Sequence, residues 1–227
     1  MAIKRNKTEL EIVKAARKII AEDGLLSFQF KDIANEAKIS TSTLRLLFCS
    51  KEDLLARILV DHLNGHHTRL LHITQTQLNL KEKVFSYGLS MIYPDYFSKD
   101  ISGCHFLLSN PAIWKALTPL RQQQLAQCFA RLSQAALALF QQAIDEKKLA
   151  GCAVEHHQLF SSYARGCSLQ LQNALYMHDK HQFVNKIIEK NMSNLIDSLP
   201  WQSPMMVCDL KKIKMTVRTV SDQSNSV

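Results

Sequence analysis

The chain has 227 residues, of which 46% are apolar, and it contains only six glycines and five prolines. This length suffices to bury a sizeable core in one or two domains, and the scarcity of helix breakers favours an all-α fold. No apolar run of about 18 residues is present, and no secretory segment opens the chain, so we expect no membrane partner and a cytoplasmic location. The formal net charge of +8 favours a polyanionic partner.

The first predicted helix covers residues 8–22. Thr8-x-x-Glu11 has the pattern of a capping box at its start, and Gly24 suits the position after its end. Apolar residues recur at helical spacing between these two signals. The sequence therefore predicts a helix with one buried face.

Residues 29–54 predict two short helices, a turn between them and the start of a further helix. Ser40 is suited to cap a helix over residues 41–48. Four side chains can turn inward there, namely Ile39, Leu44, Leu47 and Phe48, which leaves Thr41, Ser42, Thr43 and Arg45 facing out. Two short helices joined by about three residues, the second with a polar outer face, form a helix-turn-helix that places its second helix in the major groove of DNA.

The outward residues have side chains that suit DNA. The hydroxyls of Thr41, Ser42 and Thr43 can bond phosphates or bases, and Arg45 can bind a guanine edge or a phosphate. Lys51 lies in the first turn of the helix that follows residues 41–48, and a Ser50-x-x-Asp53 capping box opens that helix. Lys31 holds the corresponding place on the helix that precedes residues 41–48. The alternative is that these residues form only a solvated helix surface.

The rest of the chain predicts a helical bundle. A long helix follows Ser50 to about residue 74, Asn79-x-x-Glu82 caps another that stops near Pro94, and residues 98–118 form short helices and loops. Further helices are predicted over residues 119–148, 155–177 and 180–198, and residues 201–227 form a flexible tail. The last two helices carry more apolar positions than one buried face needs, which indicates a dimer contact in residues 155–199.

Nothing in the chain points to catalysis or to a bound metal. There is no glycine-rich phosphate loop, no nucleophile elbow and no CxxC pair among the six cysteines. His62 and His66 are four residues apart, but no third ligand stands at a fixed spacing from them. We expect no enzymatic activity, no cofactor and no metal.

The N-terminal segments resemble the tetracycline-repressor (TetR) family of bacterial transcription regulators. The resemblance begins at TELEIVKAARKIIAEDG and continues through Asp32-Ile33-Ala34, Thr43-Leu44 and Ser50 to Leu54. It implies a helix-turn-helix DNA-binding domain over residues 1–54 and a helical ligand-binding and dimerisation domain over residues 55–200. It also implies a homodimer that binds a palindromic operator on double-stranded DNA, most often as a repressor, and that is nucleoid-associated when bound.

The resemblance further implies a cavity among the middle helices for a small apolar or aromatic effector. The candidate lining residues are Tyr87, Met91, His105, Phe106, Trp114 and Phe129. Aromatic and methionine residues at helical spacing are also what an ordinary core requires, so a plain core is the alternative.

Several positions depart from the family pattern and leave a second reading open. The family usually has glycine where Lys38 and Ser42 stand, and tyrosine where Arg45 stands. A histidine that is common just before Phe48 is also missing, and Gln29 replaces a threonine cap. The first alternative is therefore an interaction module of the same fold that has lost specific DNA binding. A ligand carrier or enzyme in the C-terminal half is the second.

Overall fold

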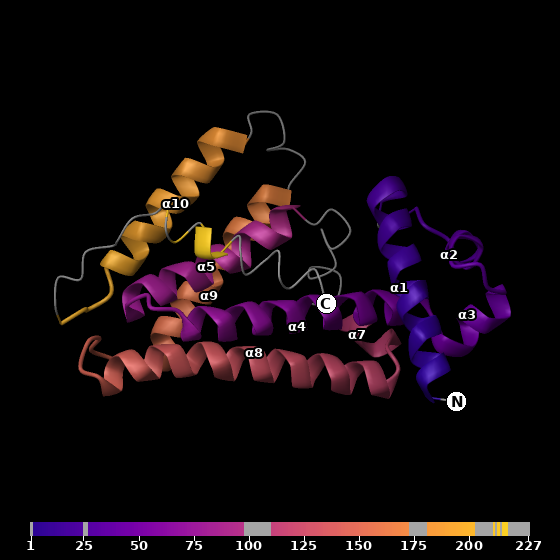
Figure 1. The fold of residues 1–227 in the computed structure, drawn as a ribbon, viewed down its shortest axis with the longest axis horizontal. Coiled ribbons are helices and arrows are strands. Elements are labelled where there is room, and N and C mark those ends of the chain that lie inside the picture. The colour runs from indigo at the N-terminus through magenta and orange to yellow at the C-terminus, as the bar shows by residue number, and fades with distance from the viewer. Residues whose placement is uncertain are drawn as a thin grey trace. The chain divides into compact units, whose positions relative to one another are not determined.

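The computed structural model describes residues 2–24, 27–97, 110–172 and 181–202, together with residues 211, 213 and 215–217. The described part is helical and holds no strand, apart from one antiparallel bridge between Leu149 and Trp201, which confirms the all-α fold class. The main helices in chain order are α1 (Ala2–Asp23), α2 (Phe30–Glu36), α3 (Thr41–Leu47), α4 (Lys51–Gln75), α5 (Leu80–Phe97), α7 (Pro111–Ala116), α8 (Pro119–Asp145), α9 (Ala153–Gln172) and α10 (His181–Asp197) (Figure 1). No described helix has the length and apolar character that crossing a membrane requires.

The chain divides into two compact units. Unit 1 comprises residues 1–63 and 98–129, and unit 2 comprises residues 64–97 and 130–227. The divisions fall inside α4 and inside α8, so each of these helices contributes its first part to unit 1 and the remainder to unit 2. The predicted domain boundary at residue 54 stays a prediction.

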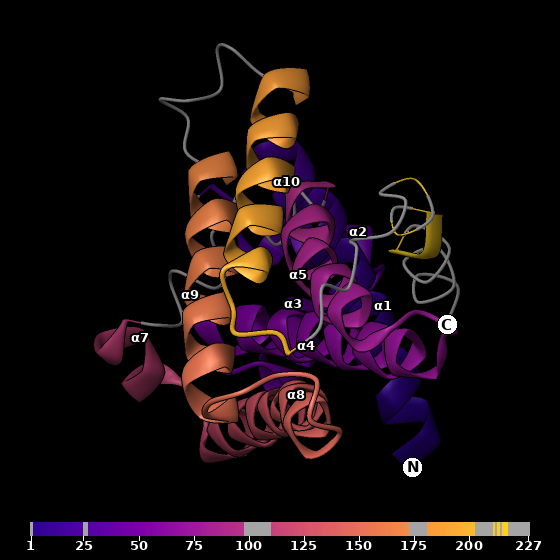
Figure 2. The same cartoon turned by 90° about the vertical axis from the view of Figure 1, so that its left-hand side faces the viewer.

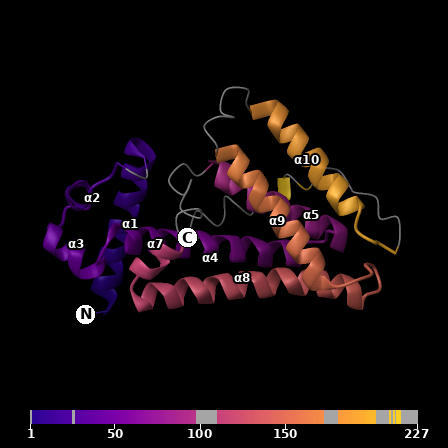
Figure 3. The ribbon, with the colours of Figure 1, turned by 180° about the vertical axis from the view of Figure 1, so that it is seen from behind.

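Unit 1 is built around one apolar core that α1 to α4 share. Ile12 and Ala16 of α1, Ile33 of α2, Leu44 of α3 and Phe48 are all within 1% of complete burial. In Figures 1 and 3, which view the molecule from opposite sides, α2 and α3 lie beside α1. Because these side chains leave water together, the core fixes the orientation of α3 within unit 1.

The predicted start of the first helix is wrong. The helix begins at Ala2, so Thr8 lies inside it and cannot cap its start. Residues 2–7 contain no glycine or proline, and nothing in them stops a helix from extending backwards. The predicted end is close, since Gly24 follows Asp23 with a φ of 87°.

Other predicted caps are confirmed. Asn79 Oδ1 accepts a hydrogen bond from the Glu82 backbone N–H at 3.0 Å, and Glu82 accepts one from Asn79 N–H at 2.9 Å, so this capping box is complete. Thr118 and Pro119 begin α8 as predicted. By contrast, α5 runs through Pro94 to Phe97, because a proline near a helix end removes only one backbone donor.

Unit 2 is organised around the close approach of α9 and α10 to α5. The rings of Tyr87 and Phe160 stack with centroids 5.9 Å apart, and Phe140 meets Phe160 edge-on at 5.8 Å. Gly88 lies where the three helices meet: an added Cβ would stand 2.4 Å from Phe160 Cζ and 2.9 Å from Met192 Cε. Figure 2 shows α5, α9 and α10 side by side. Most of the predicted tail lies outside the described residues.

We expect Gly88→Ala to lower the free energy of unfolding by about 1–3 kcal/mol, because the methyl group would overpack this contact. Gly166 of α9 is the matched control, since nothing lies within 4 Å of the position its Cβ would take. Gly166→Ala should instead stabilise the helix by about 0.5–1 kcal/mol. Urea denaturation of both variants measures the difference, and equal stability would contradict the packing at Gly88.

Candidate nucleic-acid interface

A short turn sets the position of α3 relative to α2. Lys38 adopts a φ of 55°, in the left-handed region. This conformation allows the Ile39 N–H to donate to Ala34 O at 2.9 Å and the Lys38 N–H to donate to Asn35 O at 3.1 Å. The two hydrogen bonds satisfy carbonyls at the end of α2 and redirect the chain into α3, as the sequence predicts for a helix-turn-helix.

Ser40 caps α3, as predicted. Its Oγ accepts a hydrogen bond from the Thr43 backbone N–H at 3.0 Å. The hydroxyls of Ser42 and Thr43 both lie 2.8 Å from Ser40 Oγ. Two of the three predicted hydroxyl contacts to DNA thus also belong to the cap. Thr41 is exposed, and Gln29 makes no side-chain cap at the start of α2.

The outward face of α3 consists of Thr41, Ser42, Arg45 and Leu46, all of which are exposed. Thr43 is half-buried. The sequence analysis did not assign Leu46 to either face. Its spacing of four residues from Ser42 could have placed it outward, because residues four apart share one face of a helix.

An aromatic ring lies beneath Arg45. The Arg45 guanidinium carbon lies 6.0 Å from the centroid of the Phe30 ring, at the start of α2. A guanidinium above an aromatic face is attracted by the ring's electrons, which limits the directions in which it points. Arg45 is therefore an exposed cation that is already partly oriented.

The two predicted lysines differ in their surroundings. Lys31 is exposed on the first turn of α2. Lys51 is half-buried at the start of α4, with its Nζ 4.8 Å from the centroid of the buried Phe28 ring. Both cations stand at helix starts, where backbone N–H groups also attract anions.

An ionic cluster of the buried Asp53 and Arg121 and the half-buried Glu9 and Arg57 joins three helices of unit 1. Arg121 of α8 is 5% exposed, and its Nη2 lies 3.0 Å from Glu9 Oε1 of α1. Its Nε lies 3.6 Å from Asp53 Oδ2 of α4. Arg57 binds the same Glu9 oxygen through its Nε at 2.9 Å. Sequence reasoning missed this cluster, because its members are far apart in the chain.

Asp53 connects the start of α4 to the start of α8. Its backbone N–H donates to Ser50 Oγ at 3.1 Å, which is half of the predicted capping box. Its carboxylate does not complete the box; Oδ1 instead accepts hydrogen bonds from Thr118 N–H at 3.2 Å and Thr118 Oγ1 at 2.6 Å. The Arg121 guanidinium also lies 5.2 Å from the ring centroid of Phe48, directly after α3.

The predicted effector-lining residues that the structure describes are divided between the two units. Tyr87 is buried and Met91 is half-buried, both on α5 in unit 2. Trp114 and Phe129 belong to unit 1, where they are 37% and 42% exposed. His105 and Phe106 lie outside the described residues. The assignment of these six residues to an effector site stays a prediction.

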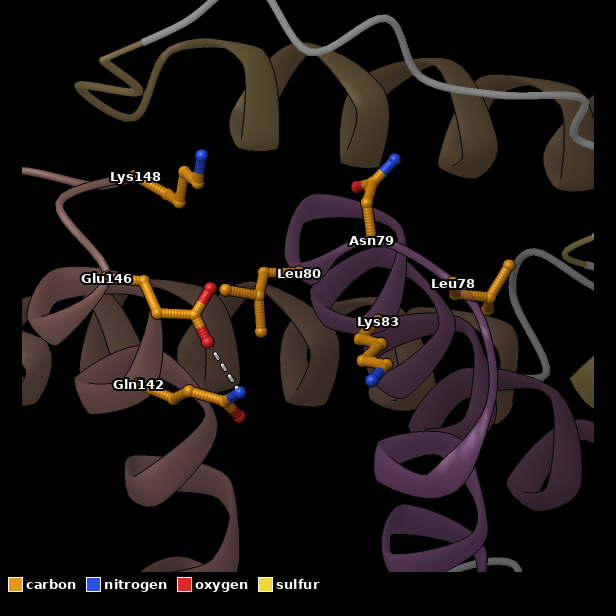
Figure 4. Close-up of a pocket in the computed structure, with 7 residues that line it drawn as sticks. All are labelled: Leu78, Asn79, Leu80, Lys83, Gln142, Glu146 and Lys148. Atoms are coloured by element: carbon orange, nitrogen blue, oxygen red, sulfur yellow. Dashed lines mark hydrogen bonds between the residues drawn. The ribbon is translucent and has the colours of Figure 1, made fainter.

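Unit 2 contains an open pocket of about 290 Å³ at the junction before α5. Its lining residues are Leu78, Asn79, Leu80, Lys83, Gln142, Glu146 and Lys148 (Figure 4). Three of the polar side chains make hydrogen bonds with each other or with the backbone: Gln142 donates to Glu146 at 2.8 Å, and Lys83 donates to Thr74 O at 2.9 Å. The pocket shares no residue with the predicted effector site.

Within the residues that the structure describes, no three histidine, cysteine or acidic side chains gather as a metal site would require. His62 and His66 are both buried on α4.

The comparison of the sequence with protein families identifies the family that unit 1 resembles. Residues 12–58 match the family described as bacterial regulatory proteins, tetR family. The N-terminal segment is therefore a tetR-family domain. It includes α2, α3 and the start of α4, and with them Thr41, Arg45 and Lys51. No curated protein matches the chain.

Solved structures share the fold over most of the chain. The fatty acid degradation regulator FadR from Bacillus halodurans superposes with a TM-score of 0.64 at 14% identity, covering 83% of this chain and 94% of that one. FadR from Bacillus subtilis, solved with stearoyl-CoA, gives 0.61 at 18% identity, covering 83% and 97%. RolR, solved with resorcinol, gives 0.57 at 16% identity, covering 96% of each chain. At these identities the likeness establishes the fold.

One departure of this chain from the tetR-family pattern falls in the turn between α2 and α3. Glycine is usual at the position of Lys38, which here holds a positive φ. Glycine adopts that conformation without strain, whereas a lysine pays a conformational cost of about 1 kcal/mol. The turn keeps its geometry despite this substitution, since its two backbone hydrogen bonds are formed.

Proposed function

We propose that this protein is a homodimeric, ligand-responsive transcriptional repressor that binds a palindromic DNA operator. The observation that carries the proposal is the exposed face of α3 in a tetR-family domain. That face presents two hydroxyls and an oriented arginine, and a lysine stands at the start of α2 and of α4; these are the groups that bind phosphates and base edges.

A dimer is part of the proposal because a palindrome requires two recognition helices at a fixed separation. The exposed apolar residues of α9 and α10 support this. Val154 and Leu159 on α9 and Ile187 on α10 are each at least 40% exposed. Apolar side chains left in water on neighbouring helices are typical of an interface with a second chain.

We place the effector in unit 2 and expect it to be small and apolar or aromatic. The rings of Tyr87, Phe140 and Phe160 supply apolar surface there. Two relatives in fold were solved with stearoyl-CoA and with resorcinol. The effector acts by favouring one of two arrangements of the recognition helices, because a ligand shifts an equilibrium only through the difference in its affinity for the two states.

The ionic cluster gives this shift a route to the DNA-binding helices. Arg121 and Thr118 stand at the start of α8, and the later part of α8 belongs to unit 2. A movement of α8 along its axis would therefore pull on Asp53, Glu9 and the ring of Phe48. We therefore infer that α8, like α4, which also has residues in both units, can transmit the change to the DNA-binding helices.

Selection of bound sequences from a random duplex pool tests the proposal. We expect a palindrome to be enriched, with half-sites about one helical turn of DNA apart or a little more. Enrichment of no sequence, together with weak binding that falls steeply with salt on any duplex, would favour the interaction module that has lost specific recognition.

Arg45 should contribute to sequence choice. Arg45→Ala is expected to lower operator affinity by about 1–3 kcal/mol if the guanidinium binds a base, and preference at one operator position should relax. Fluorescence anisotropy on operators varied one position at a time measures this. A loss of equal size on every sequence would show instead that Arg45 binds a phosphate.

A further inference from the structure

Leu46 is the most exposed of the large apolar side chains in the described residues, at 81%. An exposed leucine on a protein surface is ordinary in itself. This one is unusual in its surroundings, because it stands on a seven-residue helix whose other outward residues are Thr41, Ser42 and Arg45.

The setting of Leu46 indicates the size of its partner. Its neighbours on the helix are Ser42, four residues before it, and Thr43, three before it, and the exposed Cys49 follows the end of α3. No second large aliphatic side chain is exposed in α2 or α3. The apolar spot is therefore about one side chain wide and is ringed by polar groups and a cation, which suits a small apolar group in polar surroundings better than a wide hydrophobic interface.

The major groove of DNA offers such a group. The 5-methyl of thymine is its apolar feature, and it is surrounded by hydrogen-bonding base edges and phosphates. We propose that Leu46 reads sequence by packing on a thymine 5-methyl group in each operator half-site, next to the position that Arg45 contacts. This inference rests on the proposed function and names one base of the operator that the protein would recognise.

The test uses the full-length protein and the palindrome selected from the random pool. Each thymine is replaced in turn by deoxyuridine, which differs only in lacking the 5-methyl group. For the wild-type protein we expect one position per half-site at which this replacement weakens binding about fourfold, the effect of withdrawing one methyl group from a buried contact. Leu46→Ala should weaken binding to the thymine operator by a similar or larger factor, and its affinity should no longer change with deoxyuridine at that position.

Leu120→Ala is the matched control, because Leu120 is an exposed leucine of unit 1 at 57%, on α8. It should keep both the affinity and the deoxyuridine effect of the wild type. The inference is overturned if no thymine methyl affects binding, if the deoxyuridine effect persists in full in Leu46→Ala, or if Leu46→Ala weakens every duplex equally. The absence of any selected operator would overturn the proposed function itself, and this inference with it.

Discussion

Replacing Asp53 by alanine should lower the free energy of unfolding by about 3 kcal/mol, because the change removes one of the two carboxylates beside the buried Arg121 guanidinium and leaves it with Glu9. The side chains of Asp53 and Arg121 are 3% and 5% exposed. Thr118 would lose the acceptor of two hydrogen bonds at the same time. Urea denaturation followed by circular dichroism measures the loss.

Two further variants make this result specific. Asp53→Ala combined with Arg121→Met should recover part of the stability, because it removes the buried guanidinium that has lost one of its two carboxylates, while Glu9 keeps its ion pair with Arg57. Lys18→Ala breaks an ion pair with Glu36 that is exposed on both sides, so it should leave stability unchanged. If Asp53→Ala costs less than about 1 kcal/mol, the ionic cluster does not hold unit 1 together.

Replacing Ile187 by aspartate should produce a folded monomer. Ile187 is 40% exposed, whereas the adjacent Ile188 is 6% exposed and belongs to the core of unit 2. A charge at position 187 would be desolvated only in a dimer, so it should oppose association without opposing folding. Operator affinity should fall about a hundredfold or more, because the two half-sites would no longer be bound together.

Sedimentation measures the association and anisotropy the affinity. Leu71→Asp places the same charge on an exposed leucine of α4 and should leave the dimer intact. Ile188→Asp should instead unfold unit 2. A wild-type monomer that binds the operator fully, or a dimeric Ile187→Asp protein, would contradict the assignment of the interface to α9 and α10.

Local signals in the sequence predicted the starts of several helices in both units. The Ser40 cap, the Asn79–Glu82 box and the Thr118-Pro119 start each depend on residues within four positions of one another. The polar face of α3 follows from helical spacing in the same way, although Leu46 lies on this face and its apolar side chain gave no sign of an outward position. The start of α1 was missed because a helix can extend wherever nothing stops it.

Contacts between distant residues could not be predicted. Asp53 and Thr118 are separated by 65 positions, and Glu9 and Arg121 by 112. The spacing of residues along the chain carries no information about contacts between positions so far apart. A carboxylate in a capping-box pattern also gives no sign that it will accept hydrogen bonds from another helix. The effector site has the same difficulty: apolar residue type places Trp114 and Phe129 in a cavity as readily as on the exposed surface where they lie.

The affinity ratio between the selected palindrome and a scrambled duplex of equal length is the most direct test of specific DNA recognition by this protein. It is best measured by fluorescence anisotropy at about 0.15 M salt, where non-specific phosphate contacts are screened. We expect a ratio of about a thousand or more, with two chains bound per duplex. A ratio near one, with affinity set by salt alone, would contradict the account.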